Sequence, residues 1–206
     1  MLLNHSQGSF MNTSEQIVEA YFRICRDCLT VPDVKVPGGH GRQLDLLAYC
    51  LRENRQYHIE VHVSHAREFA MSLNKLFTTL SSKFLGTPTK KELKSRRQKS
   101  SYIRNINDAY RVFGFDPIRV ERIWVCWELP TVKGFAEQLA NYNLGEELND
   151  NPISILSFRE EIIPSLKKRV KTAHYDDVSL RTISLFKQGK RQGNIDQQKA
   201  NQQEIP

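Results

Sequence analysis

Three side chains that could bind a metal ion or transfer a proton lie close together in the chain: Asp45, Glu60 and His62. Carboxylate oxygens are the ligands that Mg²⁺ and Mn²⁺ prefer, and an added imidazole shifts the preference toward Mn²⁺ or a later transition metal. A histidine titrates at about 6.5 when unperturbed, so His62 could act as a general base. A cation held by two carboxylates polarises a phosphate and lowers the pKa of a bound water. The chemistry on offer is therefore metal-assisted hydrolysis, of which phosphodiester cleavage is one example.

A β-hairpin is the element that would bring these residues together. Two runs rich in Leu, Ile, Val and Tyr flank a polar cluster that is typical of a turn, and they carry Asp45 and Glu60 respectively. Side chains alternate along a strand, so Glu60 and His62 share one face. A turn centred on Glu53–Asn54 places Leu47 opposite Glu60, with Asp45 one diagonal step away at roughly 7–8 Å between backbones. Two carboxylates at that spacing can converge on one cation.

A polar stripe on one strand can also be the solvated face of a two-sided sheet. The strand predicted over 43–51 argues against this, because apolar residues point to both of its faces. Such a strand is covered on both sides, so Asp45 is expected in a cleft or in the interior, where a carboxylate needs a partner. His58 and His65 are interpreted as structural or surface residues.

Over about residues 12–130 the pattern resembles the PD-(D/E)xK nuclease superfamily. The resemblance implies an α/β fold with a restriction-endonuclease-like core, in which a mixed central sheet of four to five strands is flanked by helices. It also implies that Glu15, Asp45 and Glu60 bind Mg²⁺ or Mn²⁺. Glu15 could instead be a first-turn carboxylate favoured by the helix dipole. The Pro32–Asp33 pair is interpreted as unrelated to the site, because it precedes the hairpin and lacks a partner at a matching register.

The chain departs from that family where a lysine is expected, because His62 stands in the place of the Lys in Glu-x-Lys. His62 could serve as base or ligand, but a neutral imidazole cannot supply the fixed positive charge of a lysine. A migrated lysine is the other solution, and Lys75 and Lys83 lie on the helix expected after the hairpin.

The predicted elements come in the order that the resemblance requires. A first helix begins near Asn12, where a polar cap precedes apolar residues at helical spacing. We then expect an extended segment over 30–37, the hairpin over 43–64, a second helix over about 66–85 and a further strand over 119–129. An edge strand and a last helix follow at 153–158 and about 160–172. Cys25 and Cys28 fall within the predicted first helix and are interpreted as core cysteines rather than half a zinc site.

A basic segment, 83–104, accounts for the net charge of +7, because its eight Lys and Arg residues face a single Glu. A focused basic stripe binds phosphates with little sequence information, although a solvated linker is the bland alternative. Besides Lys83, the residues predicted to contact nucleic acid are Lys90, Lys91, Lys94, Arg96, Arg97, Lys99 and Arg104.

Together these patterns predict one nuclease domain over 12–186, between a disordered N-terminus, 1–11, and a disordered tail, 187–206. Its expected activity is metal-dependent cleavage of nucleic acid, with DNA favoured over RNA, and its expected location is the cytoplasm. No segment is apolar enough to span a membrane, and a homodimer is a candidate assembly. Two alternatives remain open: a catalytically inactive relative that binds nucleic acid through the basic segment, and a protein-interaction domain whose acidic pair is structural.

Overall fold

The computed structural model describes residues 11–39, 41–63, 71–90, 93, 101–148 and 150–189. Residues 1–10 of the predicted N-terminal extension, 1–11, and residues 190–206 of the predicted tail, 187–206, lie outside these ranges. Residues 178–189 are helical, so this helix runs past the boundary predicted at 187. That helix is retained because Leu180 is buried against the domain and the Lys187 ammonium donates to the Val170 carbonyl at 2.6 Å.

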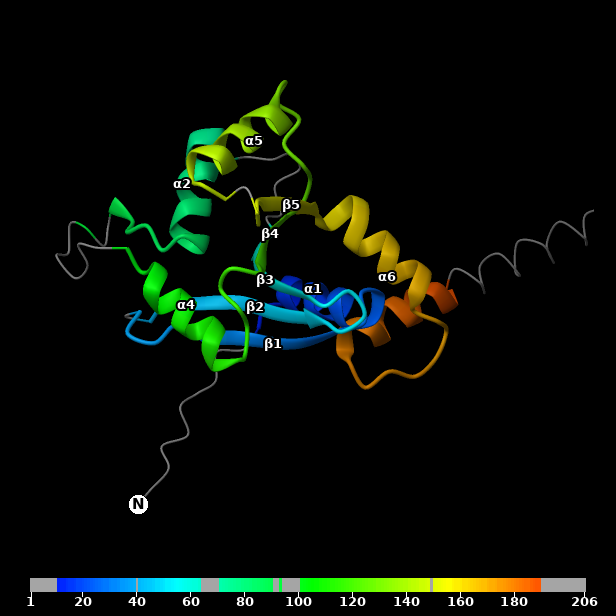
Figure 1. The fold of residues 1–206 in the computed structure, drawn as a ribbon. Helices are drawn as coiled ribbons and strands as arrows, with labels where there is room; N and C mark the ends of the chain where they lie inside the picture. The colour runs from blue at the N-terminus through cyan, green and yellow to red at the C-terminus, as the bar shows by residue number, and fades with distance from the viewer. Residues whose placement is uncertain are drawn as a thin grey trace, which may run out of the picture.

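Five strands form one open mixed sheet whose spatial order equals the chain order (Figure 1). The first three pair antiparallel as a meander, the fourth pairs parallel with the third, and the fifth pairs parallel with the fourth. The α/β class and the mixed central sheet are thus confirmed. The strands are β1 (Cys28–Lys35), β2 (Gln43–Cys50), β3 (Arg55–His62), β4 (Val120–Cys126) and β5 (Ile153–Ser157).

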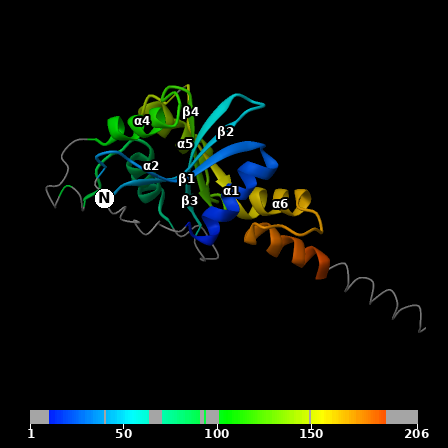
Figure 2. The ribbon, with the colours of Figure 1, turned by 90° about the horizontal axis from the view of Figure 1, so that it is seen from below.

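Helices cover both faces of this sheet. On one face α1 (Thr13–Cys25) packs against η1 (Phe158–Ile162) and α6 (Ile163–Arg169), and Figure 2 shows α1 and α6 side by side. On the other face lie α2 (Leu73–Phe84), α4 (Ile103–Val112) and α5 (Phe135–Gly145). Apolar residues of α2 pack on β4, and those of α4 pack on β2.

The helix that follows the hairpin begins later than expected. Residues 64–70 lie outside the described ranges, and α2 starts after Ser72, whose hydroxyl accepts from the Lys75 amide at 3.4 Å. Leu76, Leu80 and Phe84 recur at a spacing of four residues and are fully buried, so one side of α2 faces the sheet. Lys83 lies beside this apolar stripe, so its side chain reaches the strands under α2.

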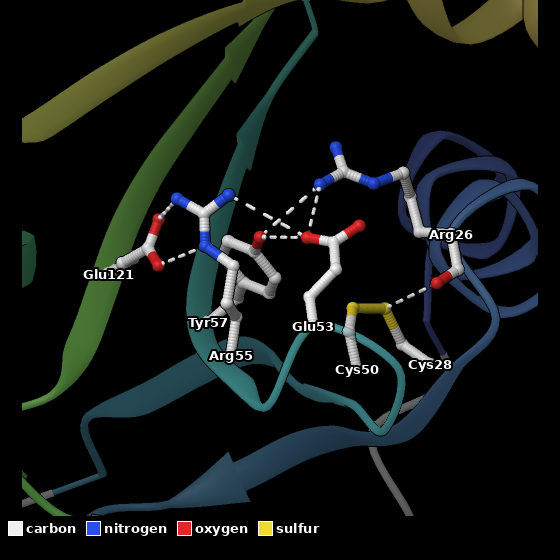
Figure 3. The surroundings of a disulfide bond; sticks show 7 residues. All are labelled: Arg26, Cys28, Cys50, Glu53, Arg55, Tyr57 and Glu121. Atoms are coloured by element: carbon white, nitrogen blue, oxygen red, sulfur yellow. Dashed lines mark hydrogen bonds and ion pairs between the residues drawn. A yellow bond between two sulfur atoms is a disulfide. The ribbon is translucent and has the colours of Figure 1, made fainter.

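A disulfide corrects the interpretation of Cys28 as a core thiol in a helix (Figure 3). The first helix ends at Cys25 because Asp27 adopts a left-handed backbone (φ 53°), and Cys28 then begins β1. Cys28 pairs across the sheet with Cys50, and the two side chains are joined. Cys25 and Cys126 are free. Disulfides are uncommon in a reducing cytoplasm, which makes the bond a test of the predicted location.

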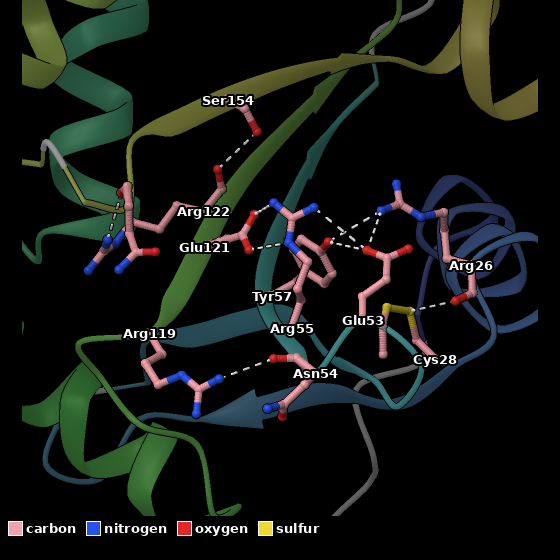
Figure 4. Close-up of polar contacts among 12 residues, drawn as sticks. Arg26, Cys28, Glu53, Asn54, Arg55, Tyr57, Arg119, Glu121, Arg122 and Ser154 are labelled. Atoms are coloured by element: carbon pink, nitrogen blue, oxygen red, sulfur yellow. Dashed lines mark hydrogen bonds and ion pairs between the residues drawn. A yellow bond between two sulfur atoms is a disulfide. The ribbon is translucent and has the colours of Figure 1, made fainter.

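Ion pairs and hydrogen bonds of charged side chains connect the hairpin turn to β4 and to the end of α1 (Figure 4). Arg55 forms a bidentate pair with Glu121 on β4, at 2.5 and 2.6 Å. Arg26, just after α1, donates to Glu53 and to the Tyr57 hydroxyl, at 3.2 Å in each case. These bonds lie at the end of the hairpin far from Asp45 and Glu60. Within the described residues, no helix has the length and apolar character needed to cross a membrane.

Candidate active site

Asp45 and Glu60 face each other on neighbouring strands. Leu46 of β2 pairs with Ile59 of β3, so Asp45 stands across from Glu60 itself rather than one diagonal step away. The predicted register is therefore wrong by two residues, because the turn lies closer to β2 than expected. Asp45 Oδ2 also accepts from the Val61 amide at 2.8 Å, which turns its carboxylate toward β3.

Lys83 completes the group from the last turn of α2. Its ammonium forms an ion pair with Glu60 Oε2 and lies 3.6 Å from Asp45 Oδ1. Of the two lysines that the sequence offers on this helix, Lys83 is the one that contacts both carboxylates. Lys75 lies more than two turns earlier and is exposed.

Burial dominates the electrostatics of this group. The Glu60 side chain is only 1% exposed and that of Asp45 18%, and removal from water disfavours a charged carboxylate. Burial raises the pKa of Asp45 to about 6, with a further rise from Glu60 that Lys83 partly offsets. The pKa of Glu60 is also raised by burial against the opposing pull of Lys83. Burial lowers the pKa of Lys83, but the charges of Glu60 and Asp45 outweigh burial, so its pKa is raised and it stays an ammonium at neutral pH.

Behind Glu60 lies a buried histidine that sequence reasoning did not single out. His58 Nε2 is 2.9 Å from Glu60 Oε1, and its Nδ1 is 2.7 Å from the Tyr110 hydroxyl of α4. Burial lowers the pKa of His58 to about 3, with a further contribution from Arg122, so the ring is neutral. The alternation of β3 does place His58 on the face of Glu60. The available signal was that a second polar residue on that face needs a partner of its own.

His62 shares that face but lies farther along the strand. Its ring stacks on Trp124 of β4 with centroids 5.3 Å apart, and burial lowers its pKa, as do the charges of Lys75 and Lys83. The structure thus places Lys83, and not His62, in contact with both carboxylates. A catalytic role for His62 stays a prediction.

Glu15 occupies a helix cap near the site. Its two carboxylate oxygens accept from the backbone and side-chain nitrogens of Asn12, at 2.9 and 2.5 Å, while its own amide donates to Asn12 Oδ1 at 3.0 Å. This is a capping box. Burial raises the pKa of Glu15, and the charges of Asp45 and Asp33 raise it further, so the three carboxylates lie within electrostatic range.

Asp33 is closer to the site than the sequence indicates. Pro32 pairs with Leu46 and Val34 with Leu44, which leaves Asp33 at the position across from Asp45. The interpretation that Asp33 has no partner at a matching register is therefore wrong. A left-handed backbone at Asp33 (φ 54°) interrupts the strand there, and its side chain accepts from Gln43 Nε2 at 2.6 Å.

Most of the predicted phosphate-binding residues, namely Lys91, Lys94, Arg96, Arg97 and Lys99, lie outside the described residues. Lys90 and Arg104, which flank them, are described and exposed. A further arginine comes from the loop before β2. Arg42 donates to the Ser82 carbonyl of α2, stacks on the Tyr102 ring at 4.6 Å, and bears electrostatically on the neighbouring Lys83.

The residues present fit a hard divalent cation. Within the described ranges no cluster of three or more His, Cys, Asp or Glu side chains is placed to hold a metal. However, two carboxylates converge, and the buried Glu60 Oε2 has no hydrogen bond of regular geometry among the described residues, only the ion pair with Lys83. A buried carboxylate oxygen without a regular hydrogen bond is a suitable ligand for Mg²⁺ or Mn²⁺.

Comparison with known proteins returned no match to a protein-family model, a curated protein or a solved structure.

Proposed function

We propose that this protein is a metal-dependent nuclease that hydrolyses phosphodiester bonds in DNA, built on a restriction-endonuclease-like core of the PD-(D/E)xK type. One observation carries the proposal: a lysine from the helix after a β-meander meets two carboxylates that face each other on adjacent strands. The element order of helix, antiparallel meander, the helices α2 and α4, and parallel strand supports it. The cytoplasm remains the proposed location.

In this proposal Asp45 and Glu60 hold the divalent cation. When bound, that cation supplies a Lewis acid for the scissile phosphate and lowers the pKa of a water. Lys83 takes the part that His62 holds in the sequence pattern. In the metal-free protein the two carboxylates raise the pKa of Lys83 and keep it an ammonium. As an ammonium beside the cation site, Lys83 would stabilise negative charge on the phosphate. Glu15 serves mainly as a cap, since Asn12 occupies both of its oxygens.

A second candidate function follows from the same contacts. The Lys83 ammonium already neutralises part of the charge on Asp45 and Glu60 without any metal. A site that balances its own charge in this way can be a structural remnant in a catalytically inactive protein. Such a protein would bind nucleic acid through its basic segment and cut nothing.

Cleavage assays separate the two functions. The substrates are supercoiled plasmid, linear duplex, single-stranded DNA and RNA, each with Mg²⁺, with Mn²⁺ and with a chelator. Asp45→Asn should abolish metal-dependent cleavage, and Lys83→Met should lower the rate by about 10²–10³-fold, the loss expected when one charge-stabilising group is removed. Both changes keep the shape of the side chain while removing its charge.

Matched controls come from the same protein. Lys75→Met lies on the same helix as Lys83 but is exposed, and Asp108→Asn lies on α4, where its carboxylate pairs only with Arg111 among the described residues. Both should cut like the wild type. Residual cleavage of equal size in Asp45→Asn would point to a contaminating nuclease. A wild type that binds DNA but cleaves no substrate with either metal would replace the enzyme by the inactive binder.

A further inference from the structure

Glu60 is held from behind by a chain of buried polar groups. His58 and Tyr110 are both fully buried, and the His58 ring lies between Glu60 Oε1 at 2.9 Å and the Tyr110 hydroxyl at 2.7 Å. The Phe84 ring of α2 meets the His58 ring edge-on, with centroids 4.8 Å apart. The imidazole therefore has a fixed plane and two fixed partners.

The partners also fix which ring nitrogen carries the proton. As the partner of the Lys83 ammonium, Glu60 acts as a carboxylate, which can only accept, so His58 Nε2 donates to Glu60 Oε1. A neutral imidazole then has a lone pair on Nδ1, which accepts from the Tyr110 hydroxyl. Arg122 also interacts with that hydroxyl and favours its donating direction, because a guanidinium has donors and no acceptor. Every bond in the chain runs the same way, toward Glu60.

This order divides the two oxygens of Glu60 between different tasks. Oε1 is occupied by His58, whereas Oε2 pairs with Lys83, whose ammonium also lies 3.6 Å from Asp45 Oδ1. Without the His58 bond the carboxylate could rotate about its terminal torsion, which is broad for glutamate. The bond thus holds Oε2 on the side where the two acidic residues converge.

We infer that His58, with its tautomer set by Tyr110, is a positioning residue that directs Glu60 Oε2 at the divalent cation. This inference rests on the proposed function, because it concerns the same metal site. Partners that stand behind metal ligands change metal affinity by about 10–100-fold when removed. A histidine that merely satisfied buried polar atoms would affect folding stability and leave metal affinity alone.

The test measures Mn²⁺ binding by calorimetry without nucleic acid, on variants shown to be folded by cooperative unfolding. His58→Leu removes the donor and should weaken Mn²⁺ binding by about tenfold or more. His58→Gln should stay within a few fold of the wild type, because its amide nitrogen can replace Nε2 as the donor. Tyr110→Phe deletes a single hydroxyl and should fall between the two.

Tyr21→Phe is the matched control, because it also deletes a buried, bonded hydroxyl, one that donates to Glu161 at 2.9 Å on the other face of the sheet. Its Mn²⁺ affinity should equal that of the wild type. In cleavage assays His58→Leu should need more Mn²⁺ for half-maximal rate, while its rate at saturating Mn²⁺ stays close to normal.

The outcomes separate this inference from the proposed function. Unchanged Mn²⁺ affinity in Tyr110→Phe and His58→Leu overturns the inference, and so does a loss in His58→Gln as large as in His58→Leu. If His58→Leu does not fold, the comparison of Tyr110→Phe with Tyr21→Phe decides. If the wild type binds Mn²⁺ but never cleaves, the proposed nuclease function is overturned. The Mn²⁺ affinities of the variants then still decide whether His58 is a positioning residue. A wild type that binds no Mn²⁺ overturns both.

Discussion

Replacing Asp45 by asparagine should make the metal-free protein more stable while it abolishes cleavage. Asparagine keeps the shape of the side chain and an oxygen that can accept from the Val61 amide. It removes a negative charge that is unfavourable in this buried position, as shown by the pKa of Asp45, which is raised from its ordinary 3.8 to about 6. Lys83 keeps its other partner, Glu60, so the substitution leaves no isolated ammonium.

The size and sign of the effect follow from proton linkage. Between pH 3.8 and about 6 the folded wild type holds a proton at Asp45 that the unfolded chain has released. Wild-type stability therefore falls as pH rises through that window, and above it the full cost is present. One pKa unit corresponds to about 1.4 kcal/mol, so the cost at pH 8 is of the order of 3 kcal/mol. Asp45→Asn escapes it.

Urea unfolding in the presence of a chelator measures this. The free energy of unfolding of Asp45→Asn should exceed that of the wild type by about 1–3 kcal/mol at pH 8, and the two should agree within about 0.5 kcal/mol near pH 3.5. Asp108→Asn, an exposed control, should show no pH-dependent difference. Adding Mn²⁺ should stabilise the wild type alone, by about 2.7 kcal/mol at a hundredfold excess over Kd. A constant difference between Asp45→Asn and wild type at both pH values would refute the reasoning.

Three further changes test other parts of the structure. Cys50→Ser should lower the free energy of unfolding by about 2–4 kcal/mol under oxidising conditions, and a reductant should lower the wild type equally and leave the variant unchanged; insensitivity of the wild type would show that the bond to Cys28 does not form. Glu15→Gln keeps the cap, since glutamine also serves at that position, and should cleave DNA far faster than Asp45→Asn. Equal losses of cleavage in the two variants would indicate that Glu15 is a metal ligand. His62→Ala should retain cleavage, as measured on plasmid, and a complete loss would restore the catalytic role predicted from the sequence.

The part of the site that sequence could predict is the part that periodicity controls. Alternation in β3 and a doubly apolar β2 are enough to place Asp45 and Glu60 on one covered face. Helical spacing on α2 is likewise enough to offer Lys83 as a candidate. These are local patterns, and they survive folding because burial enforces them.

What sequence could not predict depends on register and on distant partners. The diagonal placement of Asp45 failed because a shift of the turn moves every cross-strand pair, and nothing local specifies that shift. The disulfide was not predicted because Cys28 was assigned to the first helix, and it becomes a neighbour of Cys50 only through the pairing of β1 with β2. Likewise His58 reads as an ordinary polar strand residue until Tyr110, from a helix far along the chain, closes over it.

The hydrogen bond from the Val61 amide to Asp45 couples the state of the site to local opening of the sheet. The described backbone pairing of β2 with β3 stops at Leu46 and Ile59, and beyond it a side chain, Asp45, accepts the next strand amide. Hydrogen exchange at Val61 should therefore report on the carboxylate itself. In Asp45→Asn that amide should stay protected, and in Asp45→Ala it should exchange quickly. A single nitrogen resonance could thus follow protonation or cation binding at Asp45 without any substrate.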